Sequence, residues 1–453
     1  MSRDVRASIA ILLPNSPTLI TASRPRSSTK GPLDEPDDPL NIESLKISSP
    51  TTQNFSDDGA YTGASFSSLD PLAPDLSSVE KDLSFLLRYD NYHSLSQVDI
   101  PHALRSDFLS PTSGETLDTS LGTLEKLLAE GHFFLAAYLC GTLLTSPAIS
   151  PTDIKVIFAL FYTRLACLEI SGNTIIAAQE SKALEDLSST FYYIEPEHTA
   201  DANEPQPKYA QHIAPWPLRV LAIRLQSIGF SDPRRGIGGL YEIGLEARRE
   251  IMRADIEPAA REIWKQRLSD LGIRTVNALI EMGDLDAAKR ALASLKVPEQ
   301  ESANEATRLR AVLLLLSIGD VDAARQLCES FPETSDATFR PLLSMSEGRY
   351  DDAVVEWREL LASKDRTTDD AIISQNLAVC LLYTGQLSEA REVLESLVQT
   401  QHSFASLVFN LATVYELCSD KAVQLKHGLV EDIAKQPITG HANLDRLNAD
   451  FKL

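Results

Sequence analysis

The residues that could carry chemistry in this 453-residue chain do not assemble into a catalytic pattern. The glycine-rich run 234–241 is the best candidate for a dinucleotide-binding loop. However, Tyr241 stands where the third glycine of Gly-x-Gly-x-x-Gly would lie, and a predicted helix precedes the run where a strand is required. We interpret the run as a turn. The eight histidines include no His-Glu-x-x-His motif and no pairing with cysteine at metal-ligand spacing. The sequence therefore predicts a protein that is not an enzyme and holds neither cofactor nor metal.

Asn376, Asn410 and Tyr415 have side chains suited to binding a partner. Each asparagine is followed by leucine and alanine, which gives both the same position in two similar segments. Grooves of helical hairpins that hold acidic C-terminal tails carry a lysine or arginine one turn before such asparagines, but here those positions are Ile372 and Ser406. We therefore expect no basic clamp. The three residues are candidate partner-groove residues, with hydrogen bonding and packing inside their own hairpins as the alternative role.

Helical hairpins must position these residues. The segment 376–390 is typical of a tetratricopeptide hairpin, in which a glycine turn is followed by an apolar residue two positions later and by alanine five positions later. Glycine suits a turn where the chain reverses, often with positive φ. Alanine lets the two helices cross closely. The repeat-defining pairs are Gly283 with Ala288, Gly319 with Ala324, Gly348 with Ala353 and Gly385 with Ala390, while Gly131 with Ala136 also fits and Gly172 with Ala177 fits weakly.

The spacing of these hairpins predicts a solenoid. The four turn glycines are separated by 36, 29 and 37 residues, close to the tetratricopeptide repeat of about 34. The short interval contains Pro341, which predicts a truncated first helix and makes the Gly348 hairpin the most irregular. After it, Phe409 begins a final half-unit in which Ser419 replaces the turn glycine. The charged helix expected at 421–434 would cap the array.

The rest of the chain divides by composition. Residues 1–76 are rich in Ser, Thr, Pro and Asp without a sustained period, which predicts a disordered tail. The first 30 residues have the Arg- and Ser-rich composition of a mitochondrial transit peptide, but Pro14 and Pro17 would stop an amphipathic helix, so a plain tail is favoured. The remaining domains are N-terminal helical hairpins at 77–194, a polar proline-containing loop at 195–214 and a tetratricopeptide solenoid with a C-terminal capping helix at 215–453.

Composition excludes several functions. The chain has 42 Lys and Arg against 64 Asp and Glu, a net charge of −22. Such a chain is repelled by nucleic acid and by anionic membranes. Its apolar runs are far shorter than the ~18 residues of a membrane span. The five cysteines form no Cys-x-x-Cys pair and lie in apolar helical patterns, as expected of buried thiols in a cytoplasmic protein. We therefore expect a chain that binds no nucleic acid and does not insert directly into a membrane. No segment alternates with period two in the way of a strand, so we expect an all-α fold.

The C-terminal third resembles the family of subunit twelve of the transport protein particle (TRAPP) complex. The resemblance rests on Asn-Leu-Ala-Val-Cys-Leu-Leu-Tyr-Thr-Gly at 376–385, Leu-Glu-Ser-Leu-Val at 394–398 and Val-Phe-Asn-Leu-Ala-Thr-Val-Tyr-Glu-Leu at 408–417. Upstream, Phe-Tyr-Tyr at 191–193, Pro-Leu-Arg-Val-Leu at 217–221 and Ile-Trp-Lys-Gln-Arg-Leu at 263–268 follow the family's order. It covers roughly residues 120–435. The short Gly348 hairpin and the N-terminal tail depart from the family.

The resemblance implies a non-catalytic scaffold subunit of a vesicle-tethering assembly. That assembly is a guanine-nucleotide exchange factor for Rab GTPases in ER-to-Golgi transport and autophagy. The implied partners are the large peripheral subunits eight, eleven and thirteen and the core, with the Rab GTPase contacted only indirectly. The implied location is cytoplasmic, at the periphery of Golgi and ER–Golgi intermediate membranes. The alternative is a free-standing tetratricopeptide adaptor that binds a peptide motif of a chaperone or of a motor or cargo protein.

Overall fold

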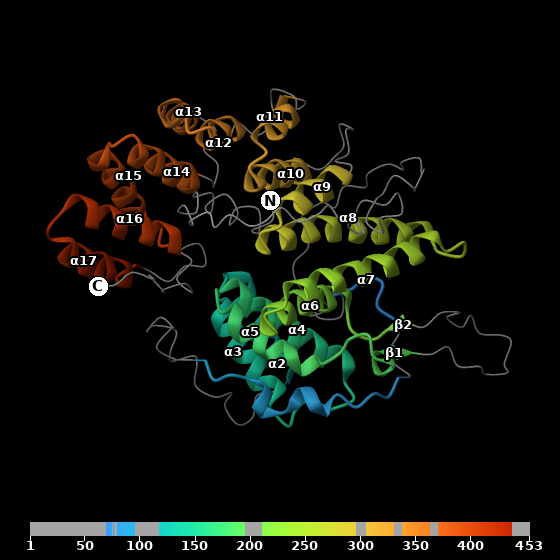
Figure 1. Ribbon diagram of the computed structural model, residues 1–453. Coiled ribbons are helices and arrows are strands. Elements are labelled where there is room, and N and C mark those ends of the chain that lie inside the picture. The colour runs from blue at the N-terminus through green and yellow to red at the C-terminus, as the bar shows by residue number, and fades with distance from the viewer. Residues whose placement is uncertain are drawn as a thin grey trace, which may run out of the picture. The chain divides into compact units, whose positions relative to one another are not determined.

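Most of the described chain folds into α-helices joined by short turns (Figure 1). The computed structural model describes residues 69–74, 76, 79–95, 117–194, 211–295, 305–329, 338–362 and 370–436. The predicted all-α fold is confirmed for these residues, and most of the predicted tail lies outside them. The α-helices are α2 (Leu117–Glu130), α3 (Phe133–Leu144), α4 (Ile154–Ile170), α5 (Thr174–Ser181), α6 (Trp216–Gly229), α7 (Pro233–Met252), α8 (Pro258–Glu281), α9 (Leu285–Ser294), α10 (Glu305–Ile318), α11 (Val321–Glu329), α12 (Phe339–Ser346), α13 (Tyr350–Ala362), α14 (Asp370–Tyr383), α15 (Leu387–Gln399), α16 (Ala405–Cys418) and α17 (Ala422–Ala434).

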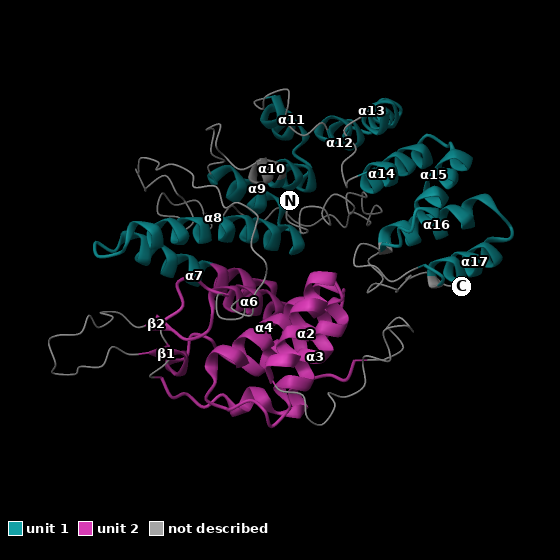
Figure 2. Cartoon of the chain, turned by 180° about the vertical axis from the view of Figure 1, so that it is seen from behind, with its two compact units in different colours: residues 1–53, 241–437, 448–453 teal, residues 54–240, 438–447 magenta. Residues whose placement is uncertain are grey.

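The chain forms two compact units, which divide inside α7 between Leu240 and Tyr241 (Figure 2). In the N-terminal unit, α3 packs against α4, and α5 packs against α6. Helix α4 carries apolar residues on nearly all sides, so other elements can surround it. Phe158 and Phe161, near its centre, are fully buried. A helix that is hydrophobic all round is a core helix. This helix therefore forms the centre of the unit.

Residues 79–95 lie in the N-terminal unit and contain no α-helix. Two short 3₁₀ turns, η3 (Ser84–Leu87) and η4 (Tyr89–Asn91), interrupt an otherwise irregular path. Leu83, Leu86 and Leu87 have the i, i+3, i+4 spacing of a helix, and the sequence predicts helical hairpins from residue 77. The structure has only 3₁₀ turns at these leucines, so the expected local structure differs. Leu83 and Leu86 are fully buried, which satisfies the same apolar pattern with a single tight turn.

The predicted loop at 195–214 is shorter than expected. Strand β1 (Tyr193–Ile194) pairs antiparallel with β2 (Gln211–His212), and Ile213 and Ala214 are buried after it. Residues 195–210 lie outside the described part of the chain. The aromatic run before the loop packs internally, because the Tyr192 hydroxyl donates to the Leu184 carbonyl oxygen at 2.7 Å and its side chain is buried. Tyr192 therefore belongs to the packing of the N-terminal unit.

The glycine-rich run 234–241 is helical, which corrects its interpretation as a turn. It forms the first two turns of α7, where Asp232 accepts hydrogen bonds from the N–H groups of Arg234 and Arg235. A Cβ atom at Gly236 would lie 2.6 Å from Ser227 Cβ. Gly236 and Gly239 therefore serve close packing of α7 against α6, at the usual cost in helix propensity.

The C-terminal unit is a series of helical hairpins with one common turn. In the α8–α9, α10–α11, α12–α13 and α14–α15 pairs, the turn glycine has φ between 74° and 87°. In the last of these, Gly385 N–H donates to Leu382 O at 3.1 Å and Gln386 N–H donates to Leu381 O at 2.8 Å. This is the Schellman pattern that closes a helix with a left-handed residue. The alanine five positions after each glycine is fully buried where the second helix crosses the first.

Helix α12 is the shortest of the first helices in these hairpins. It has 8 residues, whereas α14 has 14. Pro341 lies in its first turn, where a missing N–H removes no intrahelical bond. The short helix therefore begins near the proline, in agreement with the irregular hairpin that the sequence predicts.

Candidate partner-binding site

Asn376 and Asn410 lie on the first helices of consecutive hairpins, α14 and α16. Asn376 is 6% exposed, and Asn410 is half-buried. The Nδ2 atom of each is buried and has no hydrogen-bond partner in the structure. A buried donor without an acceptor costs about 1–3 kcal/mol. The structure therefore holds two unsatisfied amide donors at equivalent positions of neighbouring repeats.

Tyr415 lies inside the contact between α15 and α16. Its hydroxyl donates to Glu395 Oε1 at 3.0 Å, and the Arg391 guanidinium lies 5.3 Å from its ring centre. Burial is the main cause that raises the pKa of Tyr415 well above its ordinary value, and the nearby Glu395 carboxylate adds to the shift. The side chain is only 6% exposed. The structure thus places the Tyr415 side chain in the packing between α15 and α16.

A direct side-chain contact fixes α14 and α16 beside each other near the asparagines. The Ser406 hydroxyl donates to Gln375 Oε1 at 3.3 Å. No cation stands one turn before either asparagine, since those positions are Ile372 and Ser406. Neutral amide donors without a neighbouring cation suit carbonyl oxygen acceptors better than a free carboxylate, which favours charged donors.

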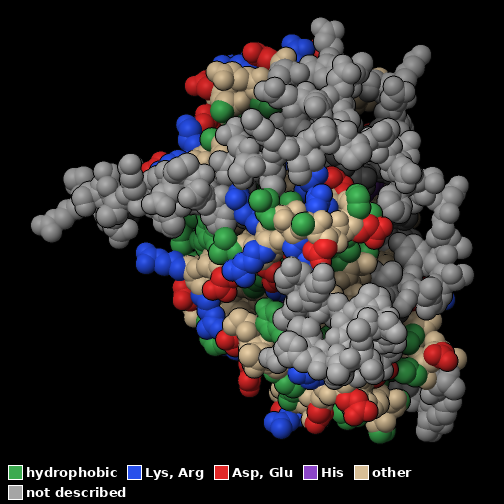
Figure 3. Space-filling view, turned by 90° about the vertical axis from the view of Figure 1, so that its right-hand side faces the viewer, with side chains coloured by type: hydrophobic (Ala, Val, Ile, Leu, Met, Phe, Trp, Pro, Cys, Tyr) green, Lys and Arg blue, Asp and Glu red, His purple; other side chains and the backbone are tan. Residues whose placement is uncertain are grey.

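Charged side chains link successive hairpins along the C-terminal unit. Lys289 on α9 lies 2.7 Å from Asp320 at the next turn, and their hydrogen bond raises the pKa of Lys289 and lowers that of Asp320. Equivalent bridges join the second helix of one hairpin to the next hairpin farther along, namely Arg325 to Glu347 and Arg358 to Glu389. Lys and Arg side chains lie among Asp and Glu side chains on the face drawn in Figure 3. We call the three bridges Lys289–Asp320, Arg325–Glu347 and Arg358–Glu389 the ion-pair ladder.

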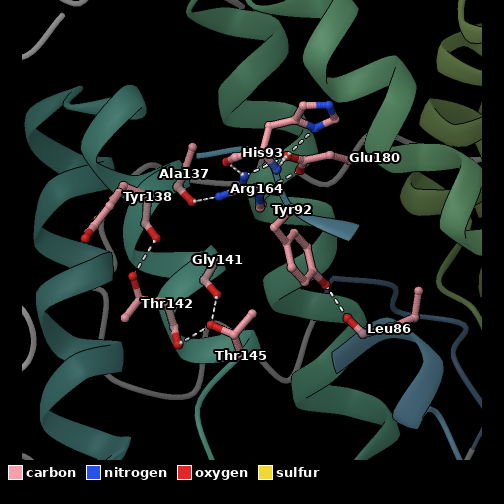
Figure 4. A network of polar contacts seen from close by, with 10 residues as sticks. All are labelled: Leu86, Tyr92, His93, Ala137, Tyr138, Gly141, Thr142, Thr145, Arg164 and Glu180. Atoms are coloured by element: carbon pink, nitrogen blue, oxygen red, sulfur yellow. Dashed lines mark hydrogen bonds and ion pairs between the residues drawn. The ribbon is translucent and has the colours of Figure 1, made fainter. Parts of the chain in front are cut away.

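Sequence reasoning missed a buried charged pair in the N-terminal unit. Arg164 on α4 and Glu180 on α5 are 2% and 1% exposed. Arg164 Nε donates to Glu180 Oε2 at 2.6 Å, and Nη2 donates to Glu180 Oε1 at 2.7 Å. Its Nη1 also donates to the Ala137 carbonyl oxygen at 2.9 Å, so α3 is joined to the pair (Figure 4).

The pair also holds the main chain of His93. The His93 N–H donates to Glu180 Oε1 at 2.8 Å, and Arg164 Nη2 donates to the His93 carbonyl oxygen at 3.0 Å. Gly141 leaves the room that the guanidinium needs, because a Cβ there would lie 2.3 Å from Arg164 Nη1. The available sequence signal was that Arg164 and Glu180 each stand among apolar residues of α4 and α5. A charged side chain is almost never fully buried without a partner, so two such residues suggest a pair.

The described residues also bear on metal sites, membrane-spanning helices and exposed thiols. They contain no cluster of His, Cys, Asp and Glu that could hold a metal ion. None of their helices is long and apolar enough to cross a membrane. The thiols of Cys140, Cys167 and Cys380 are buried, as the sequence predicts, whereas Cys328 is half-buried and Cys418 is exposed.

Comparison with known proteins agrees with the repeat architecture. A tetratricopeptide-repeat family model matches residues 273–337, which include the Gly283 and Gly319 hairpins. The mouse protein named trafficking protein particle complex subunit 12 is 25% identical over 363 residues, covering 72% of this chain and 44% of its own length. The human protein of the same name is 24% identical over 360 residues, covering 71% of this chain and 47% of its own length.

The chain spans less than half the length of these curated relatives. The family model falls on hairpins whose turns and buried alanines have tetratricopeptide geometry. The chain is thus a tetratricopeptide-repeat protein similar to subunit 12 of the trafficking protein particle complex.

Proposed function

We propose that this protein is a non-catalytic scaffold subunit of a TRAPP-type tethering complex. The observation that carries the proposal is the similarity to a named complex subunit over 72% of the chain, together with a fold of stacked hairpins. Such arrays bind partners because each hairpin adds its surface to an extended face. The protein would act by docking other subunits, and the exchange reaction on the Rab GTPase would belong to other subunits.

Asn376 and Asn410 are the proposed docking donors in the C-terminal unit. Neighbouring helices pack about 8–10 Å apart, and an extended chain rises about 3.3 Å per residue. The two amides would therefore bind two carbonyl oxygens along one edge of an extended partner segment. Rotation of each side chain would present its Nδ2–H group, and binding would recover the cost of leaving it unsatisfied.

The proposed partners are the large peripheral subunits eight, eleven and thirteen and the core of the complex. The proposed setting is ER-to-Golgi transport and autophagy, with the protein in the cytoplasm at the surface of Golgi and ER–Golgi intermediate membranes. The relatives' names support membership in the complex. Attachment through partners accords with described helices that cannot span a membrane.

Quantitative affinity purification of the tagged full chain tests this proposal. The wild-type chain should recover TRAPP core and peripheral subunits in near-equal amounts. Asn376→Ala with Asn410→Ala should reduce recovery of at least one subunit by about 10- to 100-fold, because each lost hydrogen bond contributes about 1 kcal/mol. Asn277→Ala is the matched control, since Asn277 is exposed on α8. Recovery of no TRAPP subunit by the wild-type chain would refute the scaffold function.

A free-standing tetratricopeptide adaptor is the second candidate. The observation in its favour is the pair of amide donors at one-repeat spacing, which could bind the main chain of a short peptide without any complex. Recovery of chaperones or motor proteins in place of TRAPP subunits, with the same loss in the double asparagine variant, would establish this function.

A further inference from the structure

Residues 79–95 lie on the N-terminal unit in the manner of a bound peptide. We call this segment the strap. Four apolar side chains anchor it, Leu83, Leu86, Tyr92 and Leu95, and each is at least nine-tenths buried. Hydrogen bonds from the strap to the hairpins are few: Leu83 N–H donates to the Pro151 carbonyl oxygen at 3.0 Å, and the remainder involve His93. A few apolar anchors with main-chain hydrogen bonds are the usual features of peptide recognition.

Arg164 and Glu180 form hydrogen bonds to the main chain of the strap at a single residue. One residue, His93, is held at both its N–H and its C=O group, by Glu180 Oε1 and Arg164 Nη2 respectively (Figure 4). The His93 side chain is 49% exposed. The His93 Nδ1 atom also lies 3.5 Å from Glu180 Oε1. The two hydrogen bonds, however, are made by backbone groups that every residue except proline carries, so the pair can hold the main chain of other residues at this position.

Tyr92 supplies the side-chain contact that sets the register. The Tyr92 ring packs edge-on against the Phe161 ring, with 6.3 Å between their centres. The Arg164 guanidinium lies 5.1 Å from the centre of the Tyr92 ring. The neighbouring Tyr89, by contrast, is 72% exposed. An aromatic residue one position before the clamped residue is thus the specific element of the segment.

The pair would keep its geometry without the strap. Arg164 makes three of its four hydrogen bonds to Glu180 and Ala137, which belong to α5 and α3. Removal of the strap would leave one donor on Arg164 and one acceptor position on Glu180 directed toward the vacated surface. Unsatisfied charged groups of this kind favour binding of a new main-chain segment.

We propose that Arg164 and Glu180 form a main-chain clamp in a peptide-binding site, which residues 79–95 occupy and which a partner segment of the same kind can occupy in their place. The ligand class is an irregular polypeptide segment with an aromatic residue before the clamped position and leucines upstream. This site lies in the N-terminal unit and does not depend on the asparagine donors or on the scaffold function.

Peptide binding to the full chain tests the site. The variant Leu86→Ala with Tyr92→Ala loosens the strap and leaves the clamp intact, and the probe is a fluorescent synthetic peptide of residues 79–95. The variant should bind the probe at micromolar concentration. The wild-type chain should bind about 1,000-fold more weakly, because its own strap competes at an effective concentration near the millimolar range. Tyr89→Ala, in the same segment, should behave as the wild type.

Hydrogen exchange of the wild-type chain provides a second measurement, which does not depend on whether a variant folds. If the strap can leave the site, its buried amides should exchange at least about tenfold faster than those of α4, through an opening smaller than global unfolding. The proposal is overturned if strap and α4 amides exchange at the same rate. It is also overturned if the loosened variant stays folded and binds no probe, or if a probe with alanine at the Tyr92 position binds equally well.

Discussion

Replacement of Arg164 by methionine should strongly destabilise the N-terminal unit. The variant loses four hydrogen bonds, two to Glu180 and one each to the carbonyl oxygens of Ala137 and His93. Glu180 would keep its buried charge with one donor, the His93 N–H. Removing one partner of a buried ion pair costs about 3–5 kcal/mol. For a unit of this size, such a loss lowers the midpoint of thermal unfolding by about 10 °C.

Thermal and urea denaturation, followed by circular dichroism, measure this effect. The double variant Arg164→Met with Glu180→Leu should regain at least about half of the lost stability, because replacing both charges by apolar groups removes the uncompensated one. Lys126→Met is the control, since the exposed Lys126–Glu130 pair should contribute no more than about 0.5 kcal/mol. The reasoning is refuted if Arg164→Met costs under about 1 kcal/mol, or if the double variant shows the sum of the two single losses.

Three further substitutions or modifications follow from local geometry. Gly141→Ala should cost about 1–3 kcal/mol in urea denaturation, because its Cβ would displace the Arg164 guanidinium. Gly385→Ala should cost about 1–2 kcal/mol, because its φ of 81° strains any residue with a Cβ. At about pH 8, alkylation followed by mass spectrometry should label exposed Cys418 quickly but Cys380 only after unfolding, since burial raises the pKa of Cys380 to about 12.

Gly122→Ala is the control for both glycine substitutions. Gly122 lies inside α2, and nothing stands within 4 Å of an added Cβ. Alanine there should stabilise the helix by up to about 1 kcal/mol. Equal losses of stability for alanine at Gly122 and Gly141 would contradict the packing argument. No loss of stability for Gly385→Ala would contradict the turn argument. Rapid alkylation of Cys380 in the folded chain would contradict its burial.

Local rules predicted the hairpins well because each hairpin is a local structure. The turn at Gly385 depends only on residues within one helical turn of it, and the start of α6 at Trp216 depends on the proline that follows. The short α12 follows in the same way from Pro341. Such elements are determined by neighbours in sequence, which a single chain displays directly.

Contacts between distant residues explain the errors. The run 234–241 is helical because its glycines let α7 approach α6, an advantage that turn propensity does not reveal. Arg164 binds Glu180 and His93, which are 16 and 71 positions away, so no spacing rule joins them. Among the candidate groove residues, the repeat pattern placed Asn376 and Asn410 correctly on first helices, but it could not distinguish them from Tyr415, whose partners lie on α15.

The ion-pair ladder has a mechanical consequence for the C-terminal unit. Its bridges join neighbouring hairpins through side chains that are largely open to solvent, such as Lys289 and Arg325 at 59% and 46% exposure. Ions screen exposed charges over about 8 Å at physiological ionic strength, so each bridge is a soft restraint between firm hairpins. The array should therefore yield under load first at the α9–α10 and α11–α12 junctions, where successive hairpins contact each other least, while its hairpins keep their form. In a protein that links larger bodies, this compliance would let the spacing of attached partners vary without unfolding.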